Sequence, residues 1–144
     1  MRKRTKHLRR AAAVVETAVV APVLVVAMLG MMEVGYAFLV RQTVTMASRE
    51  GARAASLPGG TMSDVNFAVD AAMESVGLDG YEVDSNVASL GPSDTEVWVS
   101  VSIPLNRVSF TGSLLGGGSF DIGSTTTMRR EGVSVDPSGT GVAP

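Results

Sequence analysis

The chain has 144 residues, of which 45% are hydrophobic and 18% are charged, and its formal net charge is −2. That length fits one small domain with an appendage, and the apolar content excludes an intrinsically disordered chain. The chain has no cysteine and one histidine, His7, which excludes thiol catalysis, thiolate metal sites and multi-histidine metal sites within one chain.

The charges are divided unevenly along the chain. Residues 1–10 contain six of the twelve basic residues and no acid, whereas the remaining chain contains all fourteen acids. We interpret residues 1–11 as a basic cytoplasmic leader. The acidic body argues against a nucleic-acid partner, because such a partner needs basic residues on a folded surface.

A long apolar segment follows the basic residues at positions 1–10. Residues 11–32 contain one charged residue, Glu16, and one proline, Pro22. A helix of this length measures about 33 Å, and a bilayer core measures about 30 Å. The positive-inside rule then places the N-terminus in the cytoplasm and the C-terminal body outside it. A cleaved secretory signal is the alternative, but the apolar run is long and has no small-residue exit.

The helical pattern continues beyond the apolar segment. We predict one helix over residues 12–57, transmembrane to about residue 33 and then projecting, with a bend at Pro22. Pro58-Gly59-Gly60 ends it. One face of the projecting part is small and apolar: Val40, Val44, Ala47, Gly51, Ala54 and Ala55. We expect the small residues at 47, 48, 51 and 52 to pack under the chain's own sheet.

Residues 58–131 are predicted to form a small extracytoplasmic α+β domain. Thr61 or Ser63 caps a second short helix that ends at Gly77. Alternating patterns predict strands over residues 81–87 and 96–103, which pair antiparallel, and a weaker strand over residues 122–130. Residues 111–119 read as a glycine-rich loop and residues 132–144 as a flexible tail. The expected fold is pilin-like: a long membrane-spanning helix packed by a small antiparallel sheet and a second helix.

Several segments resemble the TadE-like family, the minor pilins or pseudopilins of the Tad (Flp) adhesive pilus system. They are residues 9–22 (RRAAAVVETAVVAP), 30–38 (GMMEVGYAF), 47–55 (ASREGARAA) and 127–131 (TMRRE). The resemblance implies a non-enzymatic protein of the bacterial inner membrane that helps to assemble the pilus. It implies other Tad pilins and pseudopilins, an inner-membrane assembly platform and a prepilin peptidase as partners. It implies no cofactor, no metal and no catalytic residue.

The resemblance also assigns roles to particular residues. It places the prepilin peptidase cleavage between Ala11 and Ala12 and makes Glu16 the charge-pairing carboxylate. Cleavage would give Ala12 a positively charged amine, and Glu16 of one subunit would pair with this amine on a neighbour, so that neither charge is buried alone. From the charges and the family motif we also expect residues 129–131 to dock on the helix near Glu50.

Other interpretations of these features stay open. Glu16 lies five residues into the apolar run, so it can also extend to the cytoplasmic headgroups. The chain can be a permanently anchored single-pass envelope protein whose sheet binds a partner. A membrane-anchored hydrolase would need a carboxylate pair such as Glu82 with Asp84, or Asp94 with Glu96. Neighbouring acids of this kind are more often a solvated face.

Overall fold

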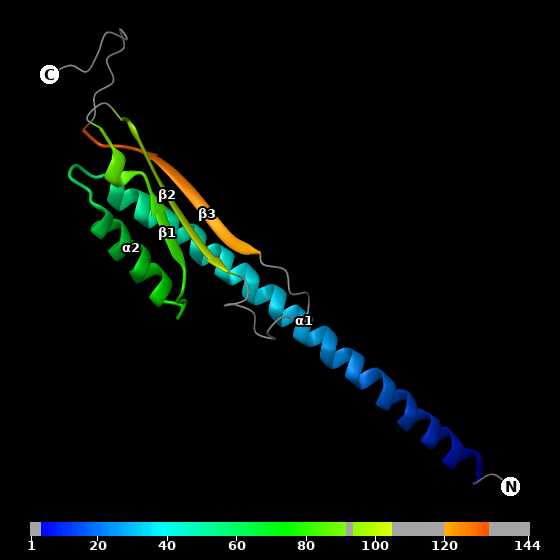
Figure 1. The fold of residues 1–144 in the computed structure, drawn as a ribbon. Coiled ribbons are helices and arrows are strands. Elements are labelled where there is room, and N and C mark those ends of the chain that lie inside the picture. The colour runs from blue at the N-terminus through cyan, green and yellow to red at the C-terminus, as the bar shows by residue number, and fades with distance from the viewer. Residues whose placement is uncertain (1–3, 92–93, 105–119, 133–144) are drawn as a thin grey trace. The chain divides into compact units, whose positions relative to one another are not determined.

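The computed structural model describes residues 4–91, 94–104 and 120–132, with side chains from residue 11 onward. The chain divides into two units, residues 1–35 and residues 36–144, which are described separately. The elements in chain order are α1 (Arg4–Ser56), α2 (Met62–Glu74), β1 (Glu82–Ser85), η1 (Val87–Ser89), β2 (Glu96–Pro104) and β3 (Asp121–Arg129) (Figure 1). The predicted loop at residues 111–119 and the tail after residue 132 lie outside the described residues.

Helix α1 contributes to both units. It runs without interruption for 53 residues, and the predicted long helix is thereby confirmed. Its predicted start near Ala12 is wrong, because the helix begins at Arg4. Arg and Lys have good helix propensity, so the helix extends through the basic segment although that segment has no apolar periodicity.

A glycine turn ends α1 and leads into α2. Gly59 has a φ of +79°, and a Cβ atom on Gly60 would lie 2.6 Å from the carbonyl oxygen of Ala54. A side chain at position 60 would therefore clash with the last turn of α1. The two glycines let the chain reverse directly against the end of the helix.

Helix α2 begins with a capping box. The side chain of Thr61 accepts a hydrogen bond from the backbone N–H of Asp64, and an Asp64 carboxylate oxygen accepts one from the N–H of Thr61 at 2.9 Å. The Thr61 hydroxyl also donates to Asp64 Oδ2 at 2.6 Å, and this bond, followed by the one from the Thr61 N–H, lowers the pKa of Asp64. The predicted Thr61 cap is thus correct. The buried face of α2 consists of Val65, Val69 and Met73, at the spacing expected of an amphipathic helix.

The sheet is antiparallel, with the strand order β1-β2-β3. Val83 of β1 pairs with Val101 of β2, as the predicted antiparallel pairing requires. Strand β1 is shorter than predicted, because Asn86 leaves the ladder and its side-chain Oδ1 accepts the N–H of Trp98 at 2.9 Å. The chain then turns through η1.

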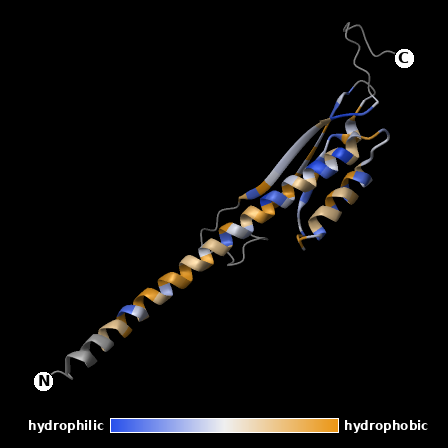
Figure 2. Ribbon diagram, turned by 180° about the vertical axis from the view of Figure 1, so that it is seen from behind, coloured by the Kyte–Doolittle hydropathy of each residue, from blue (hydrophilic) through white to orange (hydrophobic). Residues whose placement is uncertain are grey.

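The core of the second unit lies between the sheet and the two helices. Residues 36–56 of α1 and all of α2 cover the same face of the sheet (Figures 1 and 2). The four inward residues of β2 are completely buried, as their alternation predicted: Val97, Val99, Val101 and Ile103. The helices bury Val40, Val44, Ala47, Ala52, Ala55, Val65, Val69 and Met73 in the same cluster. This is the α+β fold expected from the sequence.

Strand β3 packs on α1 through hydroxyl groups. It pairs with β2 along its whole length, from Asp121 opposite Pro104 to Arg129 opposite Glu96. Ser48 of α1 is completely buried, and its Oγ lies 3.2 Å from Ser124 Oγ and 2.9 Å from Thr126 Oγ1. These three hydroxyls join α1 to β3 where an apolar contact would be usual.

The segment after β3 closes the second unit at the end of α1. The backbone N–H of Glu131 donates to the carbonyl oxygen of Ser56 at 2.8 Å, and Arg130 Nη1 donates to the carbonyls of Gly91 and Asp94. The expected docking near Glu50 is therefore wrong. Docking uses backbone carbonyls, that of Ser56 at the helix C-terminus, which needs a donor, and those of Gly91 and Asp94 before β2, and not the Glu50 side chain.

Candidate functional site

The first unit consists of an apolar helix with no protein cover. Every described residue from 11 to 28 is exposed. The side chains of Val14, Val19 and Met31 expose 68%, 65% and 76% of their surfaces. By length and composition, the segment beginning at Ala11 qualifies as a membrane span (Figure 2). Exposed apolar surface of this extent needs lipid or another helix to cover it.

The residues assigned to cleavage and charge pairing all lie on this exposed helix. Ala11, Ala12 and Glu16 are within α1, and their side chains are exposed. Ala12 and Glu16 are four residues apart, so they lie on one side of the helix about one turn apart. No side chain described from residue 11 onward hydrogen-bonds to Glu16. The geometry leaves this carboxylate open to a partner outside the described part of the chain.

A strip of small residues runs beside Glu16. Ala13, Thr17 and Ala21 follow one another at four-residue spacing, and with Val14 and Ala18 they line a shallow apolar depression. The Thr17 hydroxyl donates to the carbonyl oxygen of Ala13 at 2.9 Å, so its polar group is satisfied within the helix. Small residues at this spacing allow close approach of another helix.

Pro22 lies inside α1, and the helix continues beyond it to Ser56. Proline has no N–H, so the bond to the carbonyl of Ala18 is absent, and its ring crowds that carbonyl. The bend at Pro22 stays a prediction.

The small residues of α1 in the second unit pack in the core of that unit. A Cβ atom on Gly51 would lie 2.9 Å from Val69 Cγ2 of α2 and 3.1 Å from Val99 Cγ1 of β2. Ala47, Ser48 and Ala52 are completely buried in the same unit. These positions pack under the chain's own sheet, as the sequence analysis expected, and are not available to another subunit.

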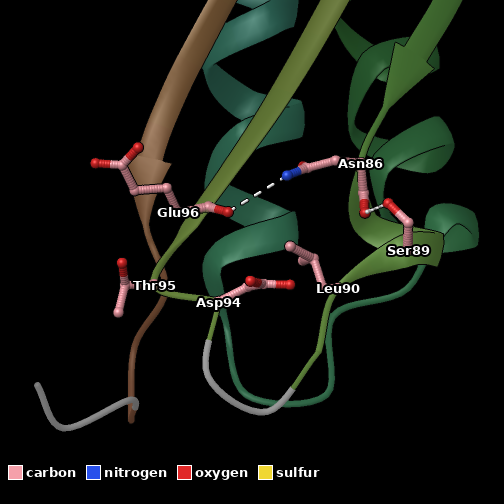
Figure 3. A pocket seen from close by; sticks show the side chains of 6 residues that line it. All are labelled: Asn86, Ser89, Leu90, Asp94, Thr95 and Glu96. Atoms are coloured by element: carbon pink, nitrogen blue, oxygen red, sulfur yellow. Dashed lines mark hydrogen bonds between the residues drawn. The ribbon is translucent and has the colours of Figure 1, made fainter.

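A polar depression at the end of the sheet was not foreseen. It is lined by Asn86, Ser89, Leu90, Asp94, Thr95 and Glu96 (Figure 3). Its polar groups are mostly bonded within the chain: Asp94 Oδ2 accepts the N–H of Gly91 at 2.7 Å, and Ser89 Oγ donates to the carbonyl of Asn86 at 2.9 Å. All six residues lie between positions 86 and 96, at η1, in the turn after it and at the first residue of β2, so one short segment forms the depression.

The acidic pairs do not form a paired-carboxylate site. In Figure 3 the Glu96 carboxylate extends away from the depression, while the Asp94 carboxylate points across it. Glu82 and Asp84 are exposed neighbours on one face of β1. Among the described residues, no three His, Cys, Asp or Glu side chains meet as a metal-binding group.

Comparison with known proteins connects this helix to one family. The family model described as TadE-like protein matches residues 11–53, which are the apolar segment and most of the part of α1 that carries the core. No curated protein and no solved structure matches the chain significantly. The sheet and α2 lie outside the matched residues.

Proposed function

From the assignment to the TadE-like family through residues 11–53, we propose that this Tad pilus-associated protein is a minor pilin or pseudopilin that takes part in pilus assembly. One observation carries the proposal: the matched segment begins with an uncovered apolar helix that only lipid or another helix can bury. Its action is association through that helix, without catalysis.

The proposed route starts in the inner membrane. The basic residues at positions 1–10 stay in the cytoplasm, and the second unit lies outside the cytoplasm. A prepilin peptidase removes residues 1–11, and the assembly platform transfers the mature chain to other Tad pilins and pseudopilins. Residues 12–33 leave lipid for contact with neighbouring helices.

Glu16 makes this transfer charge-neutral. Cleavage after Ala11 creates an ammonium group on Ala12, and Glu16 pairs with the amine of an adjacent subunit. Within its own chain, Glu16 lies one turn into the new helix. The positive end of the helix dipole also stabilises a carboxylate at this position. Both effects support keeping an acid at this depth in the apolar segment.

The start of the mature chain tests the proposal. Intact mass and N-terminal sequencing of the membrane-extracted protein should give a start at Ala12 when the prepilin peptidase is present and at Met1 when it is absent. Glu16→Gln should leave this cleavage intact and abolish incorporation into pili. Glu82→Gln, the same substitution at an exposed position of β1, is the matched control, and it should assemble normally.

A second candidate is a permanently anchored single-pass envelope protein whose sheet binds a partner. It is favoured by the helical geometry of Ala11 and Ala12, since α1 already runs through both residues and a peptidase must open this turn to reach the bond. A start at Met1 in both strains, with normal assembly of Glu16→Gln, would establish this candidate and refute the pilin route.

A further inference from the structure

The outward faces of the two helices carry opposite charges. Residues 36–56 of α1 contain three arginines and one glutamate, whereas α2 (Met62–Glu74) contains three acids and no Lys or Arg. Among the described residues, Arg53 pairs with Glu50, at 3.9 Å, and 75% and 56% of the two side chains are exposed. Such a pair is weak in water, so the basic charge of α1 stays available.

Each helix also exposes an apolar residue in line with its charges. On α1, Arg49, Arg53 and Leu57 follow at four-residue spacing, and Leu57, in the turn just after the helix, exposes 48% of its surface. On α2, Phe67, Asp70 and Glu74 lie opposite the buried face, and Phe67 exposes 78%. We call these sets the α1 stripe and the α2 stripe.

We propose that the α1 stripe of one copy docks on the α2 stripe of a second copy of this chain. The inference rests on the proposed function, because anchoring by the same helix gives neighbouring copies the same direction. Helix α2 runs back alongside α1 after the glycine turn (Figure 1). The α1 of one copy and the α2 of the next therefore meet antiparallel.

In that orientation the two stripes match in order and in length. Arg49 faces Glu74, Arg53 faces Asp70, and Leu57 faces Phe67. The α1 stripe spans about 12 Å and the α2 stripe about 10.5 Å at about 1.5 Å per residue. Asp70 Oδ1 already accepts the Tyr81 hydroxyl at 2.5 Å, and its other oxygen is left for arginine.

The proposed contact is head-to-tail, with the α1 stripe of each copy on the α2 stripe of the next; a two-fold pair that used both stripes at once would close as a dimer. A head-to-tail contact leaves one stripe of each kind unused at the ends of any assembly, and copies can add in a row. A second copy is favoured over an unrelated partner because both complementary surfaces are on the same chain.

Disulfide trapping tests the contact directly, because the chain has no cysteine of its own. The full chain in its membrane, with Leu57→Cys and Phe67→Cys together, should give a ladder of dimers, trimers and larger species on oxidation. Each single variant should give dimers at most. The matched control is Leu57→Cys with Glu82→Cys, where Glu82 is exposed on β1, and it should give no ladder, since disulfides need Cα atoms within about 7 Å.

Charge reversal provides a second measurement that does not use cysteine. Arg49→Glu or Glu74→Arg alone should weaken self-association of the detergent-solubilised chain about fivefold in sedimentation, and the two changes together should restore it. Arg129→Glu with Glu82→Arg changes the same charges outside both stripes and should have no effect.

An equal ladder in the control pair, no ladder, or cross-links only to a different pilin would overturn the inference. So would a failure of the double charge reversal to restore association. If these results occur while the chain is still cleaved at Ala12 and pili still form, the proposed function stands without this contact. Failure of cleavage and assembly refutes the proposed function, whatever the ladder shows.

Discussion

The hydroxyl of Tyr81 donates to Asp70 Oδ1 at 2.5 Å and joins the start of β1 to α2. Partial burial, followed by the bond to Asp70 and the negative charges of Asp70 and Glu74, raises the pKa of Tyr81 from 10.0 to about 12. The folded chain therefore favours the neutral phenol. This contribution to stability is fully present below about pH 10 and is lost as the pH rises toward 12.

Titration of tyrosinate absorbance checks this pKa. The chain has two tyrosines, so a Tyr36→Phe background leaves Tyr81 as the only signal. We expect a midpoint near 12, and Asp70→Asn should move it down toward 10, because the negative charge and its bond are weakened while burial remains. An unchanged midpoint in Asp70→Asn would show that the carboxylate has no part in the shift.

At Gly51, α1 lies in close contact with both α2 and β2. Gly51→Leu should lower the free energy of unfolding by roughly 3 kcal/mol, because Val69 and Val99 leave no room for the side chain. Urea unfolding followed by the fluorescence of Trp98, the single tryptophan, measures this. Gly35→Leu is the control, since a Cβ there meets nothing within 4 Å, and it should not shift the Trp98 transition.

At the scale of elements, the contact between α1 and β3 depends on Ser48, Ser124 and Thr126. Ser48→Ala should cost about 1–2 kcal/mol, because it leaves the two β3 hydroxyls without their buried partner. Adding Ser124→Ala and Thr126→Val should recover part of the loss, so the combined cost should fall below the sum of the separate costs. Urea unfolding is measured for the unchanged chain, Ser48→Ala, Ser124→Ala with Thr126→Val, and all three changes together. If the losses in unfolding free energy simply add, the hydroxyls are not coupled.

The same hydroxyls explain why some elements were easier to predict than others. Strand β2 was predicted almost to its ends, because Val97, Val99, Val101 and Ile103 alternate with polar residues and are all buried. The inward face of β3 includes Ser124 and Thr126, so its hydropathy alternates weakly and only the partner Ser48 reveals its role. Strand β1 was predicted too long, because nothing in the local pattern shows that Asn86 uses its side chain to bond Trp98.

The candidate site was predicted less completely than the fold. The apolar segment was predicted from composition, and the TadE-like family model matches residues 11–53, in agreement with the resemblance of the motifs. The roles of Ala11, Ala12 and Glu16 depend on partners outside this chain, so they stay predictions. The depression around Asn86 and Asp94 was missed, because residues 86–96 read only as a strand end and a turn, and no motif for binding marks them.

At the scale of the whole molecule, each of the two units is stabilised by different interactions. Residues 36–132 depend on the packed core, whereas the helix of residues 4–35 satisfies its backbone within itself and needs only an apolar environment. We expect heating in detergent to unfold the second unit first, with a red shift of Trp98 fluorescence, while far-ultraviolet circular dichroism retains the helical signal of the first unit. Loss of both signals in one transition would contradict this independence.

The buried Ser48 contacts Ser124, 76 residues later in the chain, and this distance has a consequence for synthesis. At about 5–20 residues per second, a ribosome needs roughly 4–15 s to make the intervening polypeptide. During that interval the apolar helix is already available for insertion, while Val40, Val44 and Ala47 have no sheet to cover them. The nascent chain therefore exposes the apolar face of α1 until β2 and β3 have been synthesised and can cover it.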